Sequence, residues 1–192
     1  MNERDGKLLY HLTSLTNLAS IASNGLRSRR DCRDLEIGFD DIADPAILAN
    51  REAFSLDAMV PFHFFAKNPF DCAVKRRNPD NRLMLLAVTR DYAQKAGWRI
   101  IPAHPLAGGV DVNPVLWDIG IDQINWDLIA KREYSDHACR QACMAEALSP
   151  QAVPLSACSS IYVASEDDKA TATRLAGHIV QHINVNARMF PR

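Results

Sequence analysis

The stretch over 8–26, LLYHLTSLTNLASIASNGL, limits the possible folds of this chain more than any other segment. Its apolar first half predicts a strand that carries His11 and Thr13, followed by a polar turn and a helix over 17–24. Gly25 then predicts the end of that helix, because glycine readily adopts the left-handed conformation that closes a helix. Side chains alternate along a strand, so His11 and Thr13 share one face at the helix entrance. This pair could hold a polar ligand, or it could merely cap a buried edge.

The length and charge of the chain suit one globular domain over 1–192. It has 192 residues, a hydrophobic content of 47% and a net charge of −1. That content is sufficient for a proper core, and the near-zero charge gives no global basic field that would indicate a nucleic-acid partner. Basic residues nevertheless gather in two short segments, and either cluster could contact phosphates or form an ordinary solvated face: Arg27, Arg29, Arg30 and Arg33, and then Lys75, Arg76 and Arg77.

The cysteines and the N-terminal residues bear on the compartment. The chain has 5 cysteines, an odd and scattered set that is typical of reduced thiols in the cytoplasm. The first residues, MNERDGK, are charged and lack the apolar region of a signal peptide. No apolar run approaches the roughly 18 residues of a membrane helix. We therefore expect a cytoplasmic protein without a membrane segment.

Short strands and short helices alternate along the rest of the chain. Apolar runs predict strands over 59–65, 82–89, 98–101 and 159–164. Helices are expected over 44–54, 90–97, from about 125 onward and over 166–183, whereas 27–41, 71–81 and 103–114 read as loop or polar chain and 184–192 shows no clear structure. The segment 138–148 has helical propensity, yet its last part could enter a strand. This mixture predicts an α+β fold.

Two of these assignments depend on prolines. Asp44 and Pro45 suit the N-cap and first position of the helix over 44–54, with Phe54 on its inner side and Arg51 near its end. Pro61 should place the strand over 59–65 near an edge or a bulge, because proline cannot donate to the ladder.

Few residues carry an obvious chemistry by themselves. The chain has no phosphate-binding glycine loop, no dinucleotide fingerprint, no metalloprotease motif and no serine nucleophile elbow. His137, Cys139 and Cys143 are possible ligands by type, but their spacing matches no standard zinc site, so we expect no metal. His178 and His182 should share a face of the last helix as an exposed pair. Glu146, in an apolar context, is either a helix-surface residue or a working carboxylate at a strand edge.

The separate segments together resemble the DarT family of DNA ADP-ribosyltransferases. The order and separation of the motifs carry the resemblance, which covers about residues 8 to 165. The matching segments are YHLT (10–13) with SIASNGL (20–26), DIADPAILANR (41–51), MVPFHF (59–64) with Asn68-Pro69-Phe70, WDLIAKREYSD (126–136) and RQACMAEALSPQAVP (140–154).

The resemblance implies the ADP-ribosyltransferase fold, with two small, mostly antiparallel sheets around an NAD cleft and helices around them. It implies that Glu146 is the catalytic carboxylate and that Arg51 faces the target base and the reacting centre. The implied NAD contacts are His11, Leu12, Thr13, Asn17, Gly25, Leu26, Arg51 and His63. The basic residues that would contact nucleic acid are Arg27, Arg29, Arg30, Lys75, Arg76 and Arg77.

One alignment question and two departures accompany this resemblance. Aligning RQA directly would put Cys143 at the glutamate position and imply an inactive enzyme, whereas the spacing to Pro154 favours Glu146. His63 stands where thymidine-modifying relatives have tyrosine. The segment 131–145, which in this family helps to select the substrate, is also unlike theirs. These departures leave the acceptor base and its sequence motif open.

The resemblance implies a toxin that uses NAD as co-substrate and attaches ADP-ribose to a base in single-stranded DNA. Its partner would be an antitoxin hydrolase that removes the modification. The alternatives are a transferase that acts on RNA, protein or a small molecule, and a catalytically silent module that binds NAD or nucleic acid.

Overall fold

A computed structural model describes residues 3–104 and 113–191 of the chain. Its strands form an eight-stranded sheet with the order β5-β4-β6-β2-β1-β3-β7-β8. Neighbouring strands are antiparallel except for β7 and β8, which run parallel. The strands are β1 (Leu8–Ser14), β2 (Val60–His63), β3 (Leu83–Thr89), β4 (Arg99–Ile101), β5 (Val115–Leu116), β6 (Glu146–Ser149), β7 (Ser160–Val163) and β8 (Ile183–Val185).

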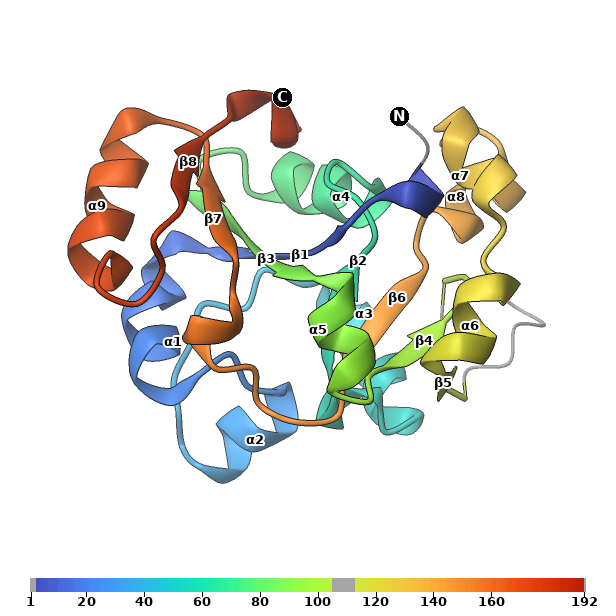
Figure 1. Cartoon of the computed structure of the whole chain (residues 1–192), viewed down its shortest axis with the longest axis horizontal. Coiled ribbons are helices and arrows are strands. Elements are labelled where there is room, and N and C mark those ends of the chain that lie inside the picture. The colour runs from blue at the N-terminus through green and yellow to red at the C-terminus, as the bar shows by residue number, and fades with distance from the viewer. Residues whose placement is uncertain (1–2, 105–112, 192) are drawn as a thin grey trace.

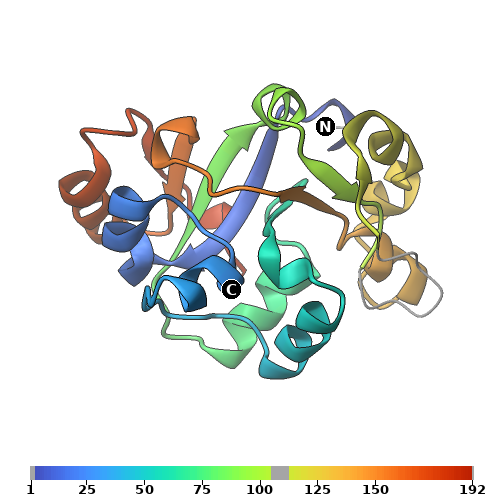
Figure 2. The same cartoon turned by 90° about the horizontal axis from the view of Figure 1, so that it is seen from below.

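The α+β class is confirmed, but the described strands join into one sheet where two were expected. The join is narrow, because β1 and β2 pair only through Tyr10 and His63, whereas β1 pairs with β3 along its whole length. The sheet therefore consists of two four-stranded halves, and these halves diverge from each other in Figure 2.

Helices cover both faces and both ends of the sheet (Figure 1). Figures 1 and 2 place α5 on one face and α3 and α4 on the other, with α9 and α6 at opposite ends. The α-helices are α1 (Leu18–Asn24), α2 (Arg29–Asp34), α3 (Pro45–Ala53), α4 (Pro69–Arg77), α5 (Arg90–Lys95), α6 (Trp117–Gln123), α7 (Trp126–Lys131), α8 (His137–Ala142) and α9 (Glu166–Ala176). Short 3-10 turns lie at Glu3–Asp5 (η1), Leu15–Asn17 (η2), Leu56–Ala58 (η3), Leu155–Ala157 (η4) and Ala187–Met189 (η5).

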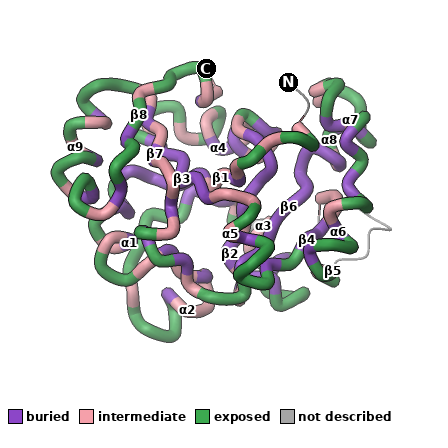
Figure 3. Tube along the Cα trace, viewed as in Figure 1, coloured by how far each residue is buried: buried purple, intermediate pink, exposed green. Residues whose placement is uncertain are grey.

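The main core lies on one face of the sheet and runs across both halves. Buried segments concentrate in the central strands, while the outer faces of the helices are exposed (Figure 3). Phe62 on β2 packs against Trp98 with ring centroids 4.8 Å apart, and both side chains are almost fully buried. A second cluster around Leu12, Val74 and Leu85 packs α4 against β1 and β3. Packing of this density fixes the relative position of the two halves.

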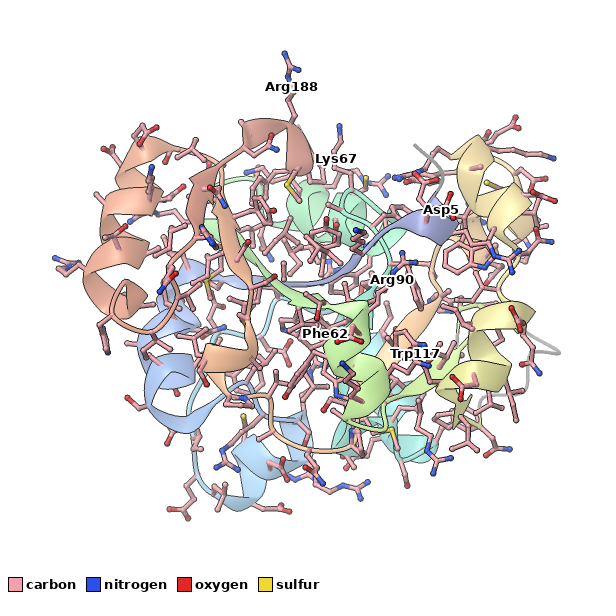
Figure 4. All side chains as sticks on the ribbon, in the orientation of Figure 1. Asp5, Phe62, Lys67, Arg90, Trp117 and Arg188 are labelled. Atoms are coloured by element: carbon pink, nitrogen blue, oxygen red, sulfur yellow. The ribbon has the colours of Figure 1, made fainter. Side chains whose placement is uncertain are left out.

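Arg90 ties the first turn of the chain to the sheet. Its guanidinium lies 5.0 Å from the Phe64 ring centroid, and its Nη2 donates to the Glu3 carbonyl at 2.7 Å. Figure 4 shows Arg90 inside the molecule, whereas Lys67 and Arg188 extend outward. Arg90 therefore has a structural role, in contrast to the outward-pointing basic side chains.

Two segments that were predicted to be loop or polar chain are helices instead. In each case an N-cap side chain supplies the signal that periodicity misses: Ser28 accepts from the Asp31 N–H at the start of α2, and Asn68 accepts from the Asp71 N–H at the start of α4. Pro69 at the first position of α4 adds to that signal. The segment 138–148 resolves into α8 followed by strand β6.

Several smaller predictions were also wrong. Pro61 lies on an interior strand; it is tolerated there because β2 meets β1 only at His63, and the Pro61 carbonyl accepts from the His11 side chain instead. Phe54 is exposed rather than packed inward. Helix α6 was missed. The last helix ends at Ala176, so β8 occupies part of its expected range and His178 and His182 are exposed residues outside any helix.

The remaining expectations for the elements hold where they can be compared. The strands over 82–89 and 98–101 and the helix after Asn125 are confirmed as β3, β4 and α7. Most of the loop expected over 103–114 falls outside the described residues. Across 3–104 and 113–191, no helix is long and apolar enough to cross a membrane.

Candidate active site

A cleft opens at the divide between the two halves of the sheet. Its lining residues come from β1, α1, α2 and the chain after them, and from α3, β2 and β6. The cleft encloses about 1150 Å³ of space, including the part that is open to solvent. The implied NAD contacts and the implied catalytic residues all line this cleft: His11, Leu12, Thr13, Asn17, Gly25, Leu26, Arg51, His63 and Glu146.

A buried ion pair lies at the inner end of the site. Arg51 Nη1 donates to both Oε1 and Oε2 of Glu146, at 2.9 Å in each case. The two side chains are only 6% and 5% exposed. Glu146 is the first residue of β6, between β2 and β4, and Arg51 reaches it from α3. Such a pair is expensive to desolvate, so its burial beside a cleft indicates a functional constraint more than a gain in stability.

Only one edge of the Arg51 guanidinium is used by this pair. Its Nε and Nη2 are buried and have no hydrogen-bond partner among the described residues. Buried donors are normally satisfied, because an orphaned one costs free energy of about 1–3 kcal/mol. The free edge presents two parallel N–H donors, a geometry that suits an oxygen acceptor of a bound substrate.

Two histidines flank this ion pair. His63 pairs with Glu146 across β2 and β6, packs against Phe70 in a tilted arrangement with the ring centroids 5.7 Å apart, and donates from Nδ1 to the Ala145 carbonyl at 3.3 Å. His104 follows β4 and also lines the cleft. Burial lowers the pKa of both His63 and His104, although the nearby Glu146 charge acts in the opposite direction. Both rings are therefore neutral at pH 7.

His11 and Thr13 present polar atoms from β1. The Nδ1 of His11 donates to the Pro61 carbonyl at 2.8 Å, and burial lowers the pKa of His11 to about 4. A neutral ring with its proton on Nδ1 leaves Nε2 as an acceptor. Thr13 Oγ1 accepts from Asn17 Nδ2 at 3.0 Å, which leaves the Thr13 hydroxyl proton available as a donor. Adjacent donor and acceptor groups of this kind suit the hydroxyls of a sugar.

Asn17 links Thr13 of β1 to the chain around Asp40. Its Nδ2 also donates to the Asp40 carbonyl at 2.9 Å, and its Oδ1 accepts from the Asp40 N–H at 2.8 Å. Asn17 is 6% exposed, so the contacts are shielded from water. The residue thus shapes the cleft by holding the chain around Asp40 against α1.

Gly25 and Leu26 form the turn at the end of α1. Gly25 has a φ of +74°, and a Cβ atom at this position would lie 3.1 Å from the Val153 carbonyl oxygen. Leu26 and Val153 exchange two backbone hydrogen bonds of 2.8 Å. A larger residue than glycine would strain this turn, because its backbone conformation and its close approach to 153 both exclude a side chain.

The basic residues predicted to contact nucleic acid divide into three groups. Arg27 and Arg29 line the cleft. Arg30 lies outside it and forms a two-point ion pair with Asp57, at 2.7 and 3.2 Å. The remaining group, which we call the α4 triplet, occupies the last turn of α4 and does not line the cleft: Lys75, Arg76 and Arg77.

Cys143 does not lie where the rival alignment would require it. It is the C-cap of α8, 1% exposed, and it packs in the main core rather than along the cleft. Burial raises the pKa of its thiol to about 12. Cys139 is also buried, whereas His137 is exposed. No group of three or more His, Cys, Asp or Glu side chains converges on a metal position in the parts of the chain that the structure describes.

The sequence reading missed several residues that line the cleft. These are principally Phe39, Asp41, Phe70, His104 and Met144. Asp41 accepts two hydrogen bonds from Arg29, at 2.7 and 2.9 Å, and both side chains line the cleft. A lone histidine or phenylalanine in a predicted loop carries no periodic signal, so only the tertiary structure identifies these residues.

The fold and the site define an α+β protein with a cleft at the join between the halves of its sheet and a buried Glu–Arg pair at the inner end of that cleft. Solved structures of DarT proteins have a similar fold. DarT of Thermus sp. 2.9 in complex with ADP-ribosylated ssDNA gives a TM-score of 0.81 at 17% identity, over 97% of each chain. The same protein in complex with NAD+ gives 0.78 at 16% identity, over 97% of this chain and 98% of that one.

A longer protein shares the same fold in part. Thermosipho africanus DarTG in complex with ADP-ribose gives a TM-score of 0.76 at 18% identity, over 96% of this chain and 51% of that one. A search of curated proteins finds no match to the sequence. A sequence model of the family described as "ssDNA thymidine ADP-ribosyltransferase, DarT" matches residues 10–190. The chain therefore belongs to the DarT family of single-stranded DNA thymidine ADP-ribosyltransferases, as the motif resemblance had implied.

Proposed function

We propose that the cleft binds NAD and that the buried Arg51–Glu146 pair transfers its ADP-ribose to thymine in single-stranded DNA. The observation that carries this proposal is the pair itself: a buried carboxylate beside a guanidinium whose second edge is unsatisfied. The DarT structures that resemble this chain contain NAD+ or ADP-ribosylated ssDNA, which supports the same assignment of ligands.

The residues of β1 and α1 fit the donor substrate. A neutral His11 offers Nε2 as an acceptor for a ribose hydroxyl, and Thr13 offers a hydroxyl donor beside it. Gly25 and Leu26 provide a narrow turn against which a flat group can lie, because no Cβ projects from Gly25. His63, packed against Phe70, gives an aromatic surface close to Glu146. We assign this surface to the nicotinamide end of NAD.

Glu146 would act on the ribose that carries nicotinamide. Cleavage of the ribose–nicotinamide bond sends the bonding electrons to nicotinamide, which leaves as a neutral base, and builds positive charge on the ribose. A carboxylate next to that charge stabilises the transition state. Arg51 orients the Glu146 carboxylate through two hydrogen bonds, and the low local dielectric strengthens the effect of its charge.

Arg51 would serve the acceptor base. In thymidine, N1 is bonded to deoxyribose, so N3 is the ring nitrogen that carries a proton. As N3 bonds to the ribose carbon, its N–H bond breaks and the proton would pass to the Glu146 carboxylate, while the negative charge that develops on the base is shared with the neighbouring carbonyl oxygens. The free Nε–Nη2 edge of Arg51 can donate to such an oxygen in this state.

The acceptor strand would be held outside the cleft by basic side chains, of which Arg30 also pairs with Asp57 and Arg77 Nε also lies 3.9 Å from Asp44 Oδ2. The α4 triplet and Arg30 are the proposed contacts for DNA phosphates. A thymine must leave its stack before it reaches the cleft, which favours single-stranded substrates. Contacts of this kind bind without reading sequence, so the sequence motif would be selected elsewhere.

The biological setting is proposed from the same family. We propose that the chain acts as a single catalytic domain over 1–192, in the cytoplasm, as the toxin of a toxin–antitoxin pair. Its antitoxin would be a hydrolase that removes ADP-ribose from the modified base. The likeness to half of a DarTG chain supports a partner of this kind.

One experiment tests the proposal. Three reactions each contain the protein and NAD labelled in its adenylate portion. They differ in the oligonucleotide: a thymine-containing DNA, the matching uracil-containing RNA, or a DNA without thymine. We expect label in the thymine-containing DNA and in neither control. Equal labelling of RNA, or labelling that does not depend on thymine, would contradict the proposed acceptor.

A further inference from the structure

We propose that Arg27 binds the diphosphate of NAD. The sequence had placed this residue among the contacts to nucleic acid. This inference rests on the proposed function, because it assumes that NAD occupies the cleft. It assigns a specific contact within that site to a residue of this chain.

The first argument compares the cations that line the cleft within the described chain. These are Arg27, Arg29 and Arg51. Arg51 is committed to Glu146, and Arg29 forms a two-point ion pair with Asp41. The three histidines of the cleft are neutral at pH 7, because burial lowers their pKa values. Arg27 is thus the cleft cation that has no carboxylate within ion-pair distance in the described structure.

The second argument is an unsatisfied donor. The Nε of Arg27 is buried and has no hydrogen-bond partner among the described residues. Buried polar groups of folded proteins normally have a partner in the protein or in bound solvent or ligand. A guanidinium that lines a cleft with an open donor fits an anionic oxygen inside that cleft, and arginine binds phosphate, like carboxylate, in two-point geometry.

The third argument is the rigidity of the backbone that carries Arg27. The preceding residue, Leu26, exchanges two 2.8 Å hydrogen bonds with Val153. The following residue, Ser28, is buried and caps α2. Arg27 is therefore held at a fixed place on the cleft wall, next to the Gly25 turn. A contact built on fixed backbone loses little entropy when a ligand binds.

The fourth argument separates the diphosphate from DNA. DNA phosphates lie on the outside of a strand, where exposed cations such as the α4 triplet can reach them. Each phosphate of a dinucleotide carries a negative charge, and both enter the cleft together with the sugars. A cation that lies inside the cleft and has a buried Nε, such as Arg27, suits the diphosphate of the dinucleotide better than a DNA phosphate.

The test measures binding of two probes by NMR titration. ADP-ribose carries the diphosphate, whereas adenosine lacks it. For Arg27→Ala we expect the Kd for ADP-ribose to rise about 10- to 100-fold, the scale of one charge-assisted contact, while the Kd for adenosine stays unchanged. Arg27→Lys should give an intermediate Kd for ADP-ribose, because it keeps the charge but loses the fork. Arg174→Ala, which removes an equal charge from the exposed face of α9, should match the wild type.

The outcomes separate this inference from the proposed function. An unchanged Kd for ADP-ribose in Arg27→Ala would overturn the inference, as would an equal loss for both probes, which indicates a distorted cleft. Weaker binding of single-stranded DNA with normal binding of ADP-ribose would also overturn it and return Arg27 to the DNA contacts. If the wild type itself failed to bind ADP-ribose, the proposed function would fail instead.

Discussion

Glu146→Gln is the substitution that best separates catalysis from binding in this cleft. Glutamine has nearly the same shape as glutamate, and its oxygen can still accept one hydrogen bond from Arg51 Nη1. What disappears is the negative charge at the start of β6. Because positive charge on the ribose develops mainly in the transition state, the loss should fall on the rate and leave the ground-state affinity for NAD nearly intact.

The size of the effect follows from the geometry. A single preorganised electrostatic group contributes roughly 10²–10⁴ in rate, or about 3–5 kcal/mol of barrier. Stability should also change, because Arg51 is only 6% exposed and would lose its counterion. Leaving a buried charge without its counterion costs about 3–5 kcal/mol, and each 1 kcal/mol lowers the Tm of a chain of this size by about 2–4 °C. Assays at 25 °C should therefore still measure folded protein.

The assay measures single-turnover transfer at saturating NAD and DNA, together with the Kd for NAD. Glu166→Gln is the matched control, since it removes an exposed carboxylate from α9 far from the cleft. Wild-type transfer by Glu146→Gln would refute the reasoning and restore the rival in which Glu146 has no catalytic part. A weakened NAD affinity with an unchanged rate would refute the division between rate and affinity.

Three further results are expected. Arg51→Lys keeps a cation beside Glu146 but loses the free Nε–Nη2 edge. Transfer of ADP-ribose to DNA should therefore fall about 10²-fold, while the hydrolysis of NAD by water falls less. Equal losses in the two reactions, measured by product analysis, would contradict a role of Arg51 at the acceptor. Burial lowers the pKa of the cleft histidines, that of His11 to about 4, so the unfolded chain binds protons before the folded one as pH falls below about 6.5. The free energy of unfolding should therefore decrease from about pH 6.5 toward about pH 4. A free energy of unfolding that stays constant over this range, measured by denaturation at each pH, would contradict this. Transfer should weaken as salt rises, and replacing the α4 triplet by alanine should make the logarithmic salt slope shallower by about 0.7 per lost phosphate contact; an unchanged slope would exclude the triplet from DNA binding.

The sequence predicted the strand and helix that begin the site because their signals are local. The apolar run before His11 and the Asn24-Gly25 stop need no tertiary context, and β1 and α1 lie where the pattern placed them. The same holds for β3, whose continuous apolar run reflects burial on both faces. The helix caps at Ser28 and Asn68 are also local signals. The polar composition of the segments that follow them nevertheless led to a prediction of loop or polar chain.

The rest depended on long-range contacts that a single sequence does not display. Arg51 and Glu146 are 95 positions apart, and their 2.9 Å contact arises because β6 inserts between β2 and β4. The parallel strand β8 was missed for the same reason, since its three residues gain strand structure only from β7. The family resemblance supplied separate roles for Arg51 and Glu146, whereas neither the order of the motifs nor periodicity predicted their ion pair.

A crystal structure of the protein with carba-NAD+ would test the account most directly. The account predicts the nicotinamide-bearing ring within hydrogen-bond distance of the Glu146 carboxylate, with the ribose hydroxyls near His11 and Thr13. A dinucleotide bound away from residues 10–26, or bound in the cleft with Glu146 directed away from that ring, would contradict it.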